Sequence, residues 1–257
     1  MSCRNGCSSR TCTGSKRFES LSTLPSAQPV HLALPVQHLL DLLQRAAGRP
    51  QHRTLIALAG LPGAGKSTLA AALAQAVNDQ AGPGSMVALS MDGFHLTRSS
   101  LALFPDPVAA LRRRGAPWTF DPQALTLRLQ ALRHRSKPVS WPAYEHSVHD
   151  PVEDALTISA GTPLVLVEGL YLLYQGHGWD LAGAFDERWF LDVPPATAHE
   201  RLVRRHMATS GQSRAQAEAR IAVNDSLNAE IVSASRCAAD WLVRDEWSAS
   251  ARLHIDA

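Results

Sequence analysis

The apolar residues of this chain fall into short continuous runs more often than into alternating ones. Runs of four to six apolar residues between polar or glycine-rich stretches are typical of strands that are buried on both faces of a parallel sheet. On this pattern five strands are predicted, at 54–59, 86–89, 164–167, 188–193 and 240–243.

Other segments repeat their apolar residues at helical spacing. The first is 34–47, where Val36, Leu39, Leu40, Leu43 and Ala47 share one face and Gly48 ends the helix. Further helices are predicted at 69–76, 121–134, 196–208 and 213–233. Strands that alternate with helices predict an α/β fold with three layers, α/β/α, around a mainly parallel five-stranded sheet.

The middle of the chain differs in kind, because seven prolines interrupt it between positions 105 and 151. Its one clear helix begins at Asp121, a capping residue, and Pro122, in the first turn. We expect an acceptor-binding insertion at about 94–155 and a helical lid at about 200–214. Both belong to one domain, 31–257, which follows a disordered polar tail, 1–30.

The composition narrows the class of protein. The 257 residues are 45% hydrophobic and 19% charged, with a formal net charge of +2, so neither a nucleic acid nor a membrane is an expected partner. Cys3, Cys7 and Cys12 crowd the start without the paired spacing of a zinc site, and Cys237 stands alone. So few cysteines in the body of the chain favour the reducing cytoplasm. The oligomeric state stays open, a homodimer included.

A nine-residue segment behind the first predicted strand carries the most specific chemistry. It reads Gly60-Leu61-Pro62-Gly63-Ala64-Gly65-Lys66-Ser67-Thr68 and fits the phosphate-binding pattern G-x-x-x-x-G-K-[ST]. Its glycines let backbone N–H groups turn toward phosphate oxygens, and the helix behind it adds the positive end of its dipole. Lys66 is expected to reach the β- and γ-phosphates of ATP, and the Ser67 hydroxyl to ligate Mg²⁺. The predicted cofactor-binding residues are Gly60, Gly63, Ala64, Gly65, Lys66, Ser67 and Thr68.

Two carboxylates follow predicted strands, at the sheet edge where parallel α/β proteins bind ligands. Asp92 is placed where it could orient an acceptor hydroxyl and take its proton, although an Asp-Gly pair is also a common turn. Glu168 ends a four-residue apolar strand, which is where a Mg²⁺-binding carboxylate is expected.

Arginines could supply the positive charge that phosphoryl transfer needs. Arg201, Arg204 and Arg205 share a face of the predicted lid helix, and we expect Arg201 and Arg205 to act in catalysis with Lys66 and Asp92. A solvated basic face is the alternative interpretation. The run 112–114 is a weaker candidate, because consecutive residues splay around a helix.

Taken together, these motifs resemble the P-loop kinases that include uridine kinase, phosphoribulokinase and bacterial pantothenate kinase. The likeness runs over about 53–245 and is greatest to the nucleoside/nucleotide kinase-like, or fructose-kinase-like, members. The resemblance implies that Asp92 is the catalytic base and that the stretch from Pro142 to His149 lines the acceptor pocket. The acceptor contacts that it implies are Asp92, His95, Tyr144, His149 and Glu168. It also likens 224–229 to an asparagine-bearing segment near the nucleotide base.

The chain departs from the uridine kinase pattern in two places. Asp150 and Pro151 follow His149 where uridine kinases carry a basic residue, and Gly93 replaces the serine of their Asp-Ser-Phe-Tyr. A pyrimidine nucleoside acceptor is therefore disfavoured. Aromatic and histidine side chains of the middle segment are expected to shape the pocket, namely Trp118, Phe120, Tyr144, His146 and His149.

Three functions remain at this stage. The leading hypothesis is Mg²⁺- and ATP-dependent phosphorylation of a hydroxyl on a small metabolite: a sugar, a nucleoside or a vitamin-like alcohol. The alternatives are a nucleotide-binding regulatory protein with little transfer activity and a nucleoside monophosphate kinase. A GTPase switch would carry an Asn-Lys-x-Asp segment, which the sequence lacks. The preference for ATP over GTP is not fixed by these residues.

Overall fold

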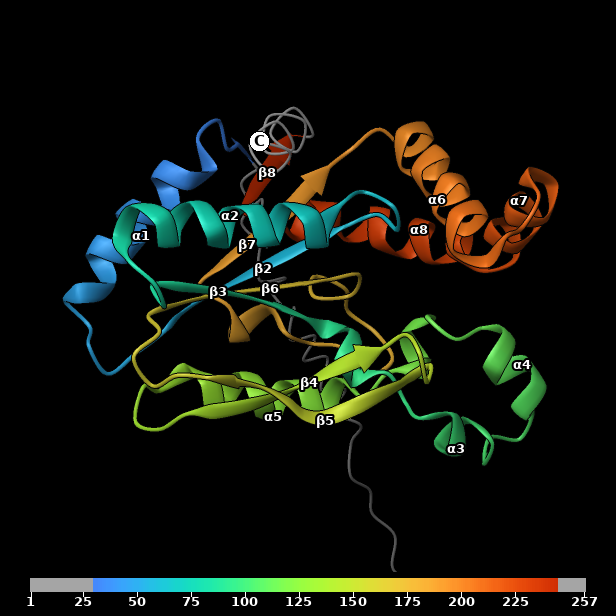
Figure 1. Ribbon diagram of the computed structural model, residues 1–257, viewed down its shortest axis with the longest axis horizontal. Helices are drawn as coiled ribbons and strands as arrows, with labels where there is room; N and C mark the ends of the chain where they lie inside the picture. The colour runs from blue at the N-terminus through green and yellow to red at the C-terminus, as the bar shows by residue number, and fades with distance from the viewer. Residues whose placement is uncertain (1–29, 245–257) are drawn as a thin grey trace, which may run out of the picture.

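The computed structural model describes residues 30–244, and these fold around a six-stranded parallel sheet flanked by helices (Figure 1). The predicted α/β class is confirmed, but the predicted count of five strands is one short. The predicted tail, apart from Val30, and the three cysteines near the N-terminus lie outside the described residues.

The central strands are the most hydrophobic part of the sheet. In β2 every residue after Thr54 is buried, and so is all of β6. Helices cover both faces of such strands, which is why their sequence reads as an unbroken apolar run. In order across the sheet, the strands are β1 (Val30–His31), β8 (Trp241–Arg244), β7 (Glu187–Asp192), β2 (Thr54–Gly60), β6 (Leu164–Gly169) and β3 (Met86–Ser90).

The missed strand is β1, which has only two residues, both exposed. Val30 pairs with Trp241 of β8 at the outer edge of the sheet. Two exposed residues form no apolar run, so the hydrophobic pattern could not reveal them.

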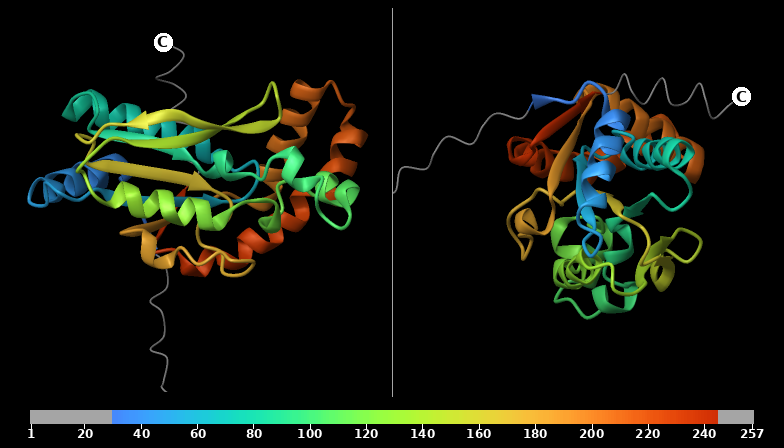
Figure 2. Two further views of the ribbon diagram at one scale, coloured as in Figure 1. Left: turned by 90° about the horizontal axis from the view of Figure 1, so that it is seen from below. Right: turned by 90° about the vertical axis from the view of Figure 1, so that its left-hand side faces the viewer.

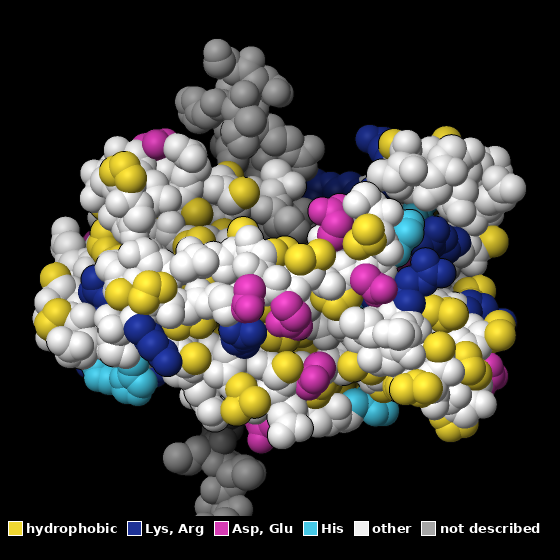
Figure 3. Space-filling view, turned by 60° about the horizontal axis from the view of Figure 1, so that its bottom comes forward, with side chains coloured by type: hydrophobic (Ala, Val, Ile, Leu, Met, Phe, Trp, Pro, Cys, Tyr) yellow, Lys and Arg dark blue, Asp and Glu magenta, His cyan; other side chains and the backbone are white. Residues whose placement is uncertain are grey.

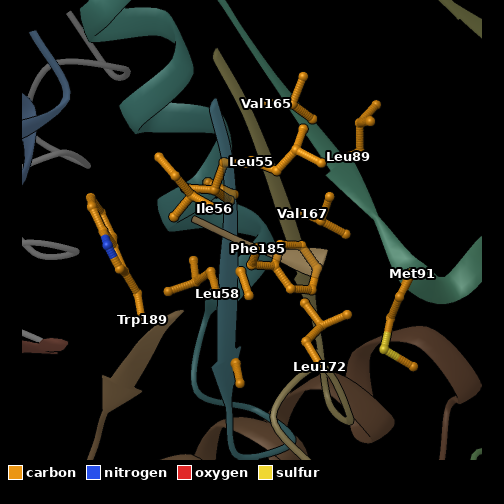
Figure 4. Close-up of a cluster of buried hydrophobic side chains, with 14 of the residues drawn as sticks. Leu55, Ile56, Leu58, Leu89, Met91, Val165, Val167, Leu172, Phe185 and Trp189 are labelled. Atoms are coloured by element: carbon orange, nitrogen blue, oxygen red, sulfur yellow. The ribbon is translucent and has the colours of Figure 1, made fainter. Parts of the chain in front are cut away.

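The core fills the space on either side of β2 and β6. Figure 4 shows side chains from these two strands beside Leu89 and Met91 and beside Leu172, Phe185 and Trp189. Most of them are fully inaccessible to solvent. Burying a large apolar side chain contributes about 1.5–3 kcal/mol, so this cluster is the main source of stability of the sheet.

The α-helices broadly follow the predictions. They are α1 (Pro35–Ala47), α2 (Lys66–Ala81), α3 (Arg98–Leu101), α4 (Pro107–Arg112), α5 (Pro122–Arg133), α6 (Pro195–Ser210), α7 (Arg214–Val223) and α8 (Asp225–Ala234). Four short 3₁₀ helices are η1 (Met91–Phe94), η2 (Pro117–Thr119), η3 (Ala182–Ala184) and η4 (Ser235–Ala238). The predicted helix 213–233 is two helices, because Asn224 leaves helical geometry between α7 and α8.

The buried face of α1 is shifted from the predicted one. Leu39, Leu42 and Ala46 are buried, whereas Ala47 is exposed. The helix α1 packs against α2, and α2 packs against β3 and β6. On the other side of the sheet, α8 contacts β2. The helices α6 and α7 stand together at one end of the molecule (Figure 1) and share a small core of their own. Among residues 30–244, no helix has the length and apolar character to cross a membrane.

A long hairpin in the proline-rich segment was not predicted. Its strands β4 (Val139–Glu145) and β5 (Asp150–Ile158) pair antiparallel, apart from the main sheet. The hairpin contacts η1 and lies beside α5, as Figures 1 and 2 show. Trp141 is fully buried, and its indole N–H donates to the Ser90 carbonyl at 2.8 Å. This bond attaches the hairpin to the end of β3.

We expect Trp141→Phe to lower the free energy of unfolding by about 1–3 kcal/mol, because it removes this buried donor and leaves the Ser90 carbonyl short of a partner. Urea denaturation followed by circular dichroism measures the change. Trp118→Phe is the matched control, since the Trp118 indole is half-buried and its N–H has no partner within the described part of the chain. Equal losses in the two variants would contradict the assigned role of Trp141.

Candidate active site

The predicted phosphate loop connects β2 to α2. Gly63 and Gly65 have φ angles of +78° and +96°, a region that favours glycine, and the Ala64 N–H donates to the Leu61 carbonyl at 3.0 Å. The helix α2 begins at Lys66, so the N–H groups of its first turn have no acceptor within their own helix and point back into the loop. This is the backbone geometry of an anion-binding site.

Lys66 lies inside this loop. Its side chain is 9% exposed, and its ammonium donates to the carbonyl oxygens of Gly60 at 3.0 Å and Leu61 at 3.1 Å. Burial lowers the pKa of Lys66, while the charges of Glu168 and Asp92 oppose that shift. The buried Lys66 ammonium therefore lies at the start of the loop, within the electrostatic influence of both carboxylates.

Glu168 ends β6 next to the loop and is 6% exposed. The Ser67 hydroxyl donates to its Oε1 at 3.0 Å. Burial raises the pKa of Glu168, and the charge of Lys66 opposes the rise. The Ser67 hydroxyl oxygen and the Glu168 carboxylate thus lie side by side, and oxygen atoms of this kind are the ligands that Mg²⁺ prefers. No group of three His, Cys, Asp or Glu side chains suited to a metal occurs within 30–244. Mg²⁺ needs no such cage, because it commonly takes one or two protein oxygens together with phosphates and water.

Asp92 belongs to η1, directly after β3. Its backbone N–H is capped by the Ser90 hydroxyl at 3.2 Å. Its carboxylate has no hydrogen-bond partner in the described part of the chain, yet its charge acts on Lys66, Glu168 and His95. The sheet therefore brings the two predicted carboxylates and the loop lysine to one edge.

The neighbouring Gly93 explains how the hairpin approaches so closely. A Cβ atom at position 93 would overlap the Pro142 carbonyl oxygen, so any other residue would push β4 away from η1. The glycine that distinguishes this chain from the uridine kinase pattern is therefore a packing requirement.

His95 lies against the hairpin in a stack of rings. Its centroid is 3.9 Å from that of Phe120 and 4.9 Å from that of Tyr144. Its Nδ1 is 2.8 Å from the Asp92 carbonyl oxygen, which can only accept, so Nδ1 carries the proton. Burial lowers the pKa of His95, Asp92 opposes the shift and Arg114 adds to it.

Arg114, which belongs to the run 112–114, lies over the Tyr144 ring beside the hairpin. Its guanidinium donates to Asp150 Oδ1 at 2.7 Å, to the Leu96 carbonyl at 2.8 Å and to the His149 carbonyl, and it lies 5.4 Å from the Tyr144 ring centroid. The signal that could have found it is Asp150, a carboxylate where the family pattern has a basic residue. A partly buried carboxylate at that position predicts a cation nearby to pair with it.

Of the three lid arginines, Arg201 is in contact with the loop and donates to the Ala64 carbonyl at 3.0 Å. The charge of Arg205 lowers the pKa of Lys66, which places it on the same side. Arg204 is largely exposed and pairs with Glu200 at 3.2 Å. The catalytic role expected of Arg201 and Arg205 stays a prediction.

The remaining predicted pocket residues are dispersed. His149 is exposed in the hairpin turn with a φ of +58°, and His146 is exposed with its ring 5.2 Å from that of Tyr144. Trp118 stacks on Phe104. In the segment 224–229, the amide nitrogens of Asn224 and Asn228 donate to the carbonyls of Arg114 and Gly115. These two asparagines therefore hold the start of α8 against the middle segment.

A phosphate loop at the end of a parallel sheet, with carboxylates on the neighbouring strands, defines a P-loop nucleotide-binding protein. The model of the phosphoribulokinase/uridine kinase family matches residues 55–229. The chain belongs to this family, and it is therefore a P-loop kinase, a class that transfers a phosphoryl group from ATP to a small molecule.

Individual relatives agree with this assignment. The ATP-dependent kinase-like protein notR' of Aspergillus versicolor is 40% identical over 173 residues, which cover 65% of this chain and 100% of the relative. The uncharacterised protein YggC of Escherichia coli is 37% identical over 222 residues, covering 86% and 88%. A solved protein from Silicibacter sp. TM1040, provisionally called a fructose transport system kinase, superposes with a TM-score of 0.72 at 34% identity over 81% of this chain and 98% of that one.

The surroundings of His95 generate a prediction about pH. Its imidazole should titrate below the ordinary value of about 6.5. Because the unfolded chain then binds the proton more tightly, the contribution of His95 to stability is present above pH 6.5 and is lost as the pH falls through its lower folded value. NMR titration of the His95 ring measures the midpoint.

Arg114→Met should raise that midpoint by removing a nearby cation, whereas Arg114→Lys keeps the charge and should leave the midpoint nearer to that of the parent. A midpoint at or above 6.5 in the parent protein would contradict the assigned environment.

Proposed function

We propose that the protein catalyses Mg²⁺- and ATP-dependent phosphoryl transfer to a hydroxyl group of a small metabolite, such as a sugar, a nucleoside or a vitamin-like alcohol. The observation that carries the proposal is the Asp92 carboxylate. It is unpaired within residues 30–244 and lies at the strand end beside the strand that carries Glu168, within the electrostatic reach of Lys66. A regulatory nucleotide-binding protein would have no need of a carboxylate kept available at this position.

In the proposed reaction, the acceptor hydroxyl lies against Asp92, which accepts its proton as the oxygen attacks the γ-phosphorus of ATP. The new oxygen–phosphorus bond forms as the bond from the γ-phosphorus to the bridging oxygen of ADP breaks. The leaving ADP keeps the electron pair of that bond. Asp92 then releases its proton to solvent, which restores the carboxylate.

Lys66 and the lid arginines would balance the charge on the transferring group. In the present geometry Lys66 donates to two loop carbonyls, so it can exchange these neutral acceptors for phosphate oxygens with little movement of its stem. Arg201 and Arg205 would act from α6, and the lid of about 200–214 would close over the transfer site.

Ser67 and Glu168 are the residues that would hold Mg²⁺. When bound, the ion shields the phosphate oxygens and aligns them for transfer. The Ser67 hydroxyl donates to Glu168 at present, and this contact keeps both oxygens at the loop.

The acceptor is proposed to bind in the segment of about 94–155, between η1 and the hairpin. His95 and Tyr144 offer ring faces and polar edges, which suit the apolar faces and hydroxyls of a sugar. Arg114 and Asp150 neutralise one another on this wall, which favours an uncharged acceptor over a nucleoside monophosphate. The name of the Silicibacter relative likewise favours a sugar among the candidates.

Lys66→Met should weaken the binding of Mg-ATP about 10- to 100-fold, because a hydrogen bond to a charged group contributes about 1.5–3 kcal/mol. Isothermal titration calorimetry measures this, with the exposed Lys137→Met as the control. Methionine keeps the apolar stem, and thermal unfolding measures how far the loss of the charge beside Glu168 lowers stability. Unchanged affinity would remove Lys66 from the nucleotide site.

Asp92→Asn should reduce turnover about 10²- to 10⁴-fold while ATP binding stays near that of the parent, as expected when a general base is lost. Release of ADP is followed in a coupled assay against sugars, nucleosides, pantothenate and nucleoside monophosphates, with Lys66→Ala as the blank. Asp79→Asn, on the exposed face of α2, is the control. ADP release that depends on a nucleoside monophosphate alone would instead favour the monophosphate kinase, and binding without any product would favour the regulatory protein.

A further inference from the structure

A cavity lies at the end of the sheet where β2 begins, opposite to the end that carries the phosphate loop. Its volume is about 500 Å³, which is within the range of small-molecule sites. The lining residues are Ala46, Arg49, His52, Arg53, Thr54, Arg133 and Asp186. Thr54 begins β2 and Gly60 ends it, and at about 3.3 Å per residue the two ends of the strand are roughly 20 Å apart. The cavity is therefore separate from the proposed transfer site.

Arg53 provides a buried cation in this cavity. It is 1% exposed, and its guanidinium donates to four backbone carbonyls, those of Leu132, His134, Ser159 and Thr162, at 2.7–3.1 Å. No carboxylate within 30–244 forms an ion pair with it. Burial lowers the pKa of Arg53, and the nearby charge of Arg135 lowers it further. The carbonyls orient this cation but leave its charge without a counter-ion.

The one carboxylate in the lining is already used. Asp186 accepts from the Arg133 guanidinium at 2.5 Å and from the Leu55 backbone N–H at 2.7 Å. Arg133 also donates to the Ala184 carbonyl at 2.7 Å, which fixes its plane. Three arginines against one aspartate leave two positive charges in excess in the cavity.

Arg49 and His52 complete the open side. Both are exposed, and the Arg49 side chain has no hydrogen bond or ion pair with another described residue. His52 packs its ring 5.1 Å from that of His134. In Figure 3, basic and histidine side chains gather at the left-hand end of the molecule, which is the end where α1 stops and β2 starts.

We propose that this cavity is a binding site for a small molecule that carries a phosphate group. The buried Arg53 already donates to carbonyls, but its charge lacks a carboxylate partner and attracts an anion into the cavity. The exposed Arg49 can then donate to the phosphate oxygens from the solvent side. The cavity is much larger than one phosphate, so it has room for the organic part of a phosphate ester. The proposal does not depend on the reaction at the phosphate loop.

The test uses the full chain carrying Lys66→Ala, so that the phosphate loop does not compete for the probes. Inorganic phosphate, glucose 6-phosphate and glucose are titrated by calorimetry. We expect both phosphates to bind, and glucose, a candidate acceptor, measures the binding at the acceptor segment that must be subtracted. Glucose 6-phosphate should bind more tightly than inorganic phosphate, because only the ester also fills the organic part of the cavity.

Charge variants locate the binding. Arg49→Ala should weaken glucose 6-phosphate binding about tenfold, and Arg49→Glu should abolish it. The same two substitutions at Arg45, an exposed arginine in the last turn of α1 outside the cavity, should change nothing. Failure of both phosphates to bind, or full binding of glucose 6-phosphate by Arg49→Glu, would overturn the proposal.

Discussion

The candidate site depends on the parallel register of β2 and β6. Leu58 of β2 pairs with Glu168 of β6, so the strand that leads into the phosphate loop and the strand that carries the carboxylate end together. The buried ammonium of Lys66 and the buried carboxylate of Glu168 are held at this edge by strands that are themselves fully covered. Burial lowers the pKa of Lys66 and raises the pKa of Glu168, and the charge of each residue opposes the shift of the other. Losing one of these two groups would remove the opposite charge that compensates the burial of the other.

Close approaches at glycine join the other parts to this edge. A side chain at Gly63 would overlap the Ala198 carbonyl, at Gly93 the Pro142 carbonyl, and at Gly169 the Met91 side chain. These three contacts attach α6 to the phosphate loop, the hairpin to η1, and η1 to the end of β6. The helix α6, the hairpin and the loop are therefore joined at one end of the sheet by close packing at glycines, in addition to their side-chain hydrogen bonds.

What the sequence predicted well is local. The phosphate loop, the strand ends and the Asp121 cap of α5 depend on neighbouring residues, and the structure has each where the pattern placed it; the Asp121 side chain accepts from the Ala124 N–H at 2.9 Å. The hairpin of β4 and β5 was missed because prolines break its apolar pattern and because its hold on the sheet is a contact between Trp141 and Ser90, 51 residues apart. The break between α7 and α8 was missed for a related reason. Asn224 is held by contacts with Arg113 and Arg114, more than a hundred residues earlier.

Arg114 shows why a departure from a family pattern can inform more than a match. Asp150 looked like the loss of a basic contact, but it pairs with a cation that comes from a different element, 36 residues earlier. That cation also faces the Tyr144 ring and binds the backbone at Leu96, next to His95. One ion pair thus fixes the hairpin, the ring stack and the residue that follows η1. Because the pair is neutral overall, it holds these rings in place without adding a net charge to the wall.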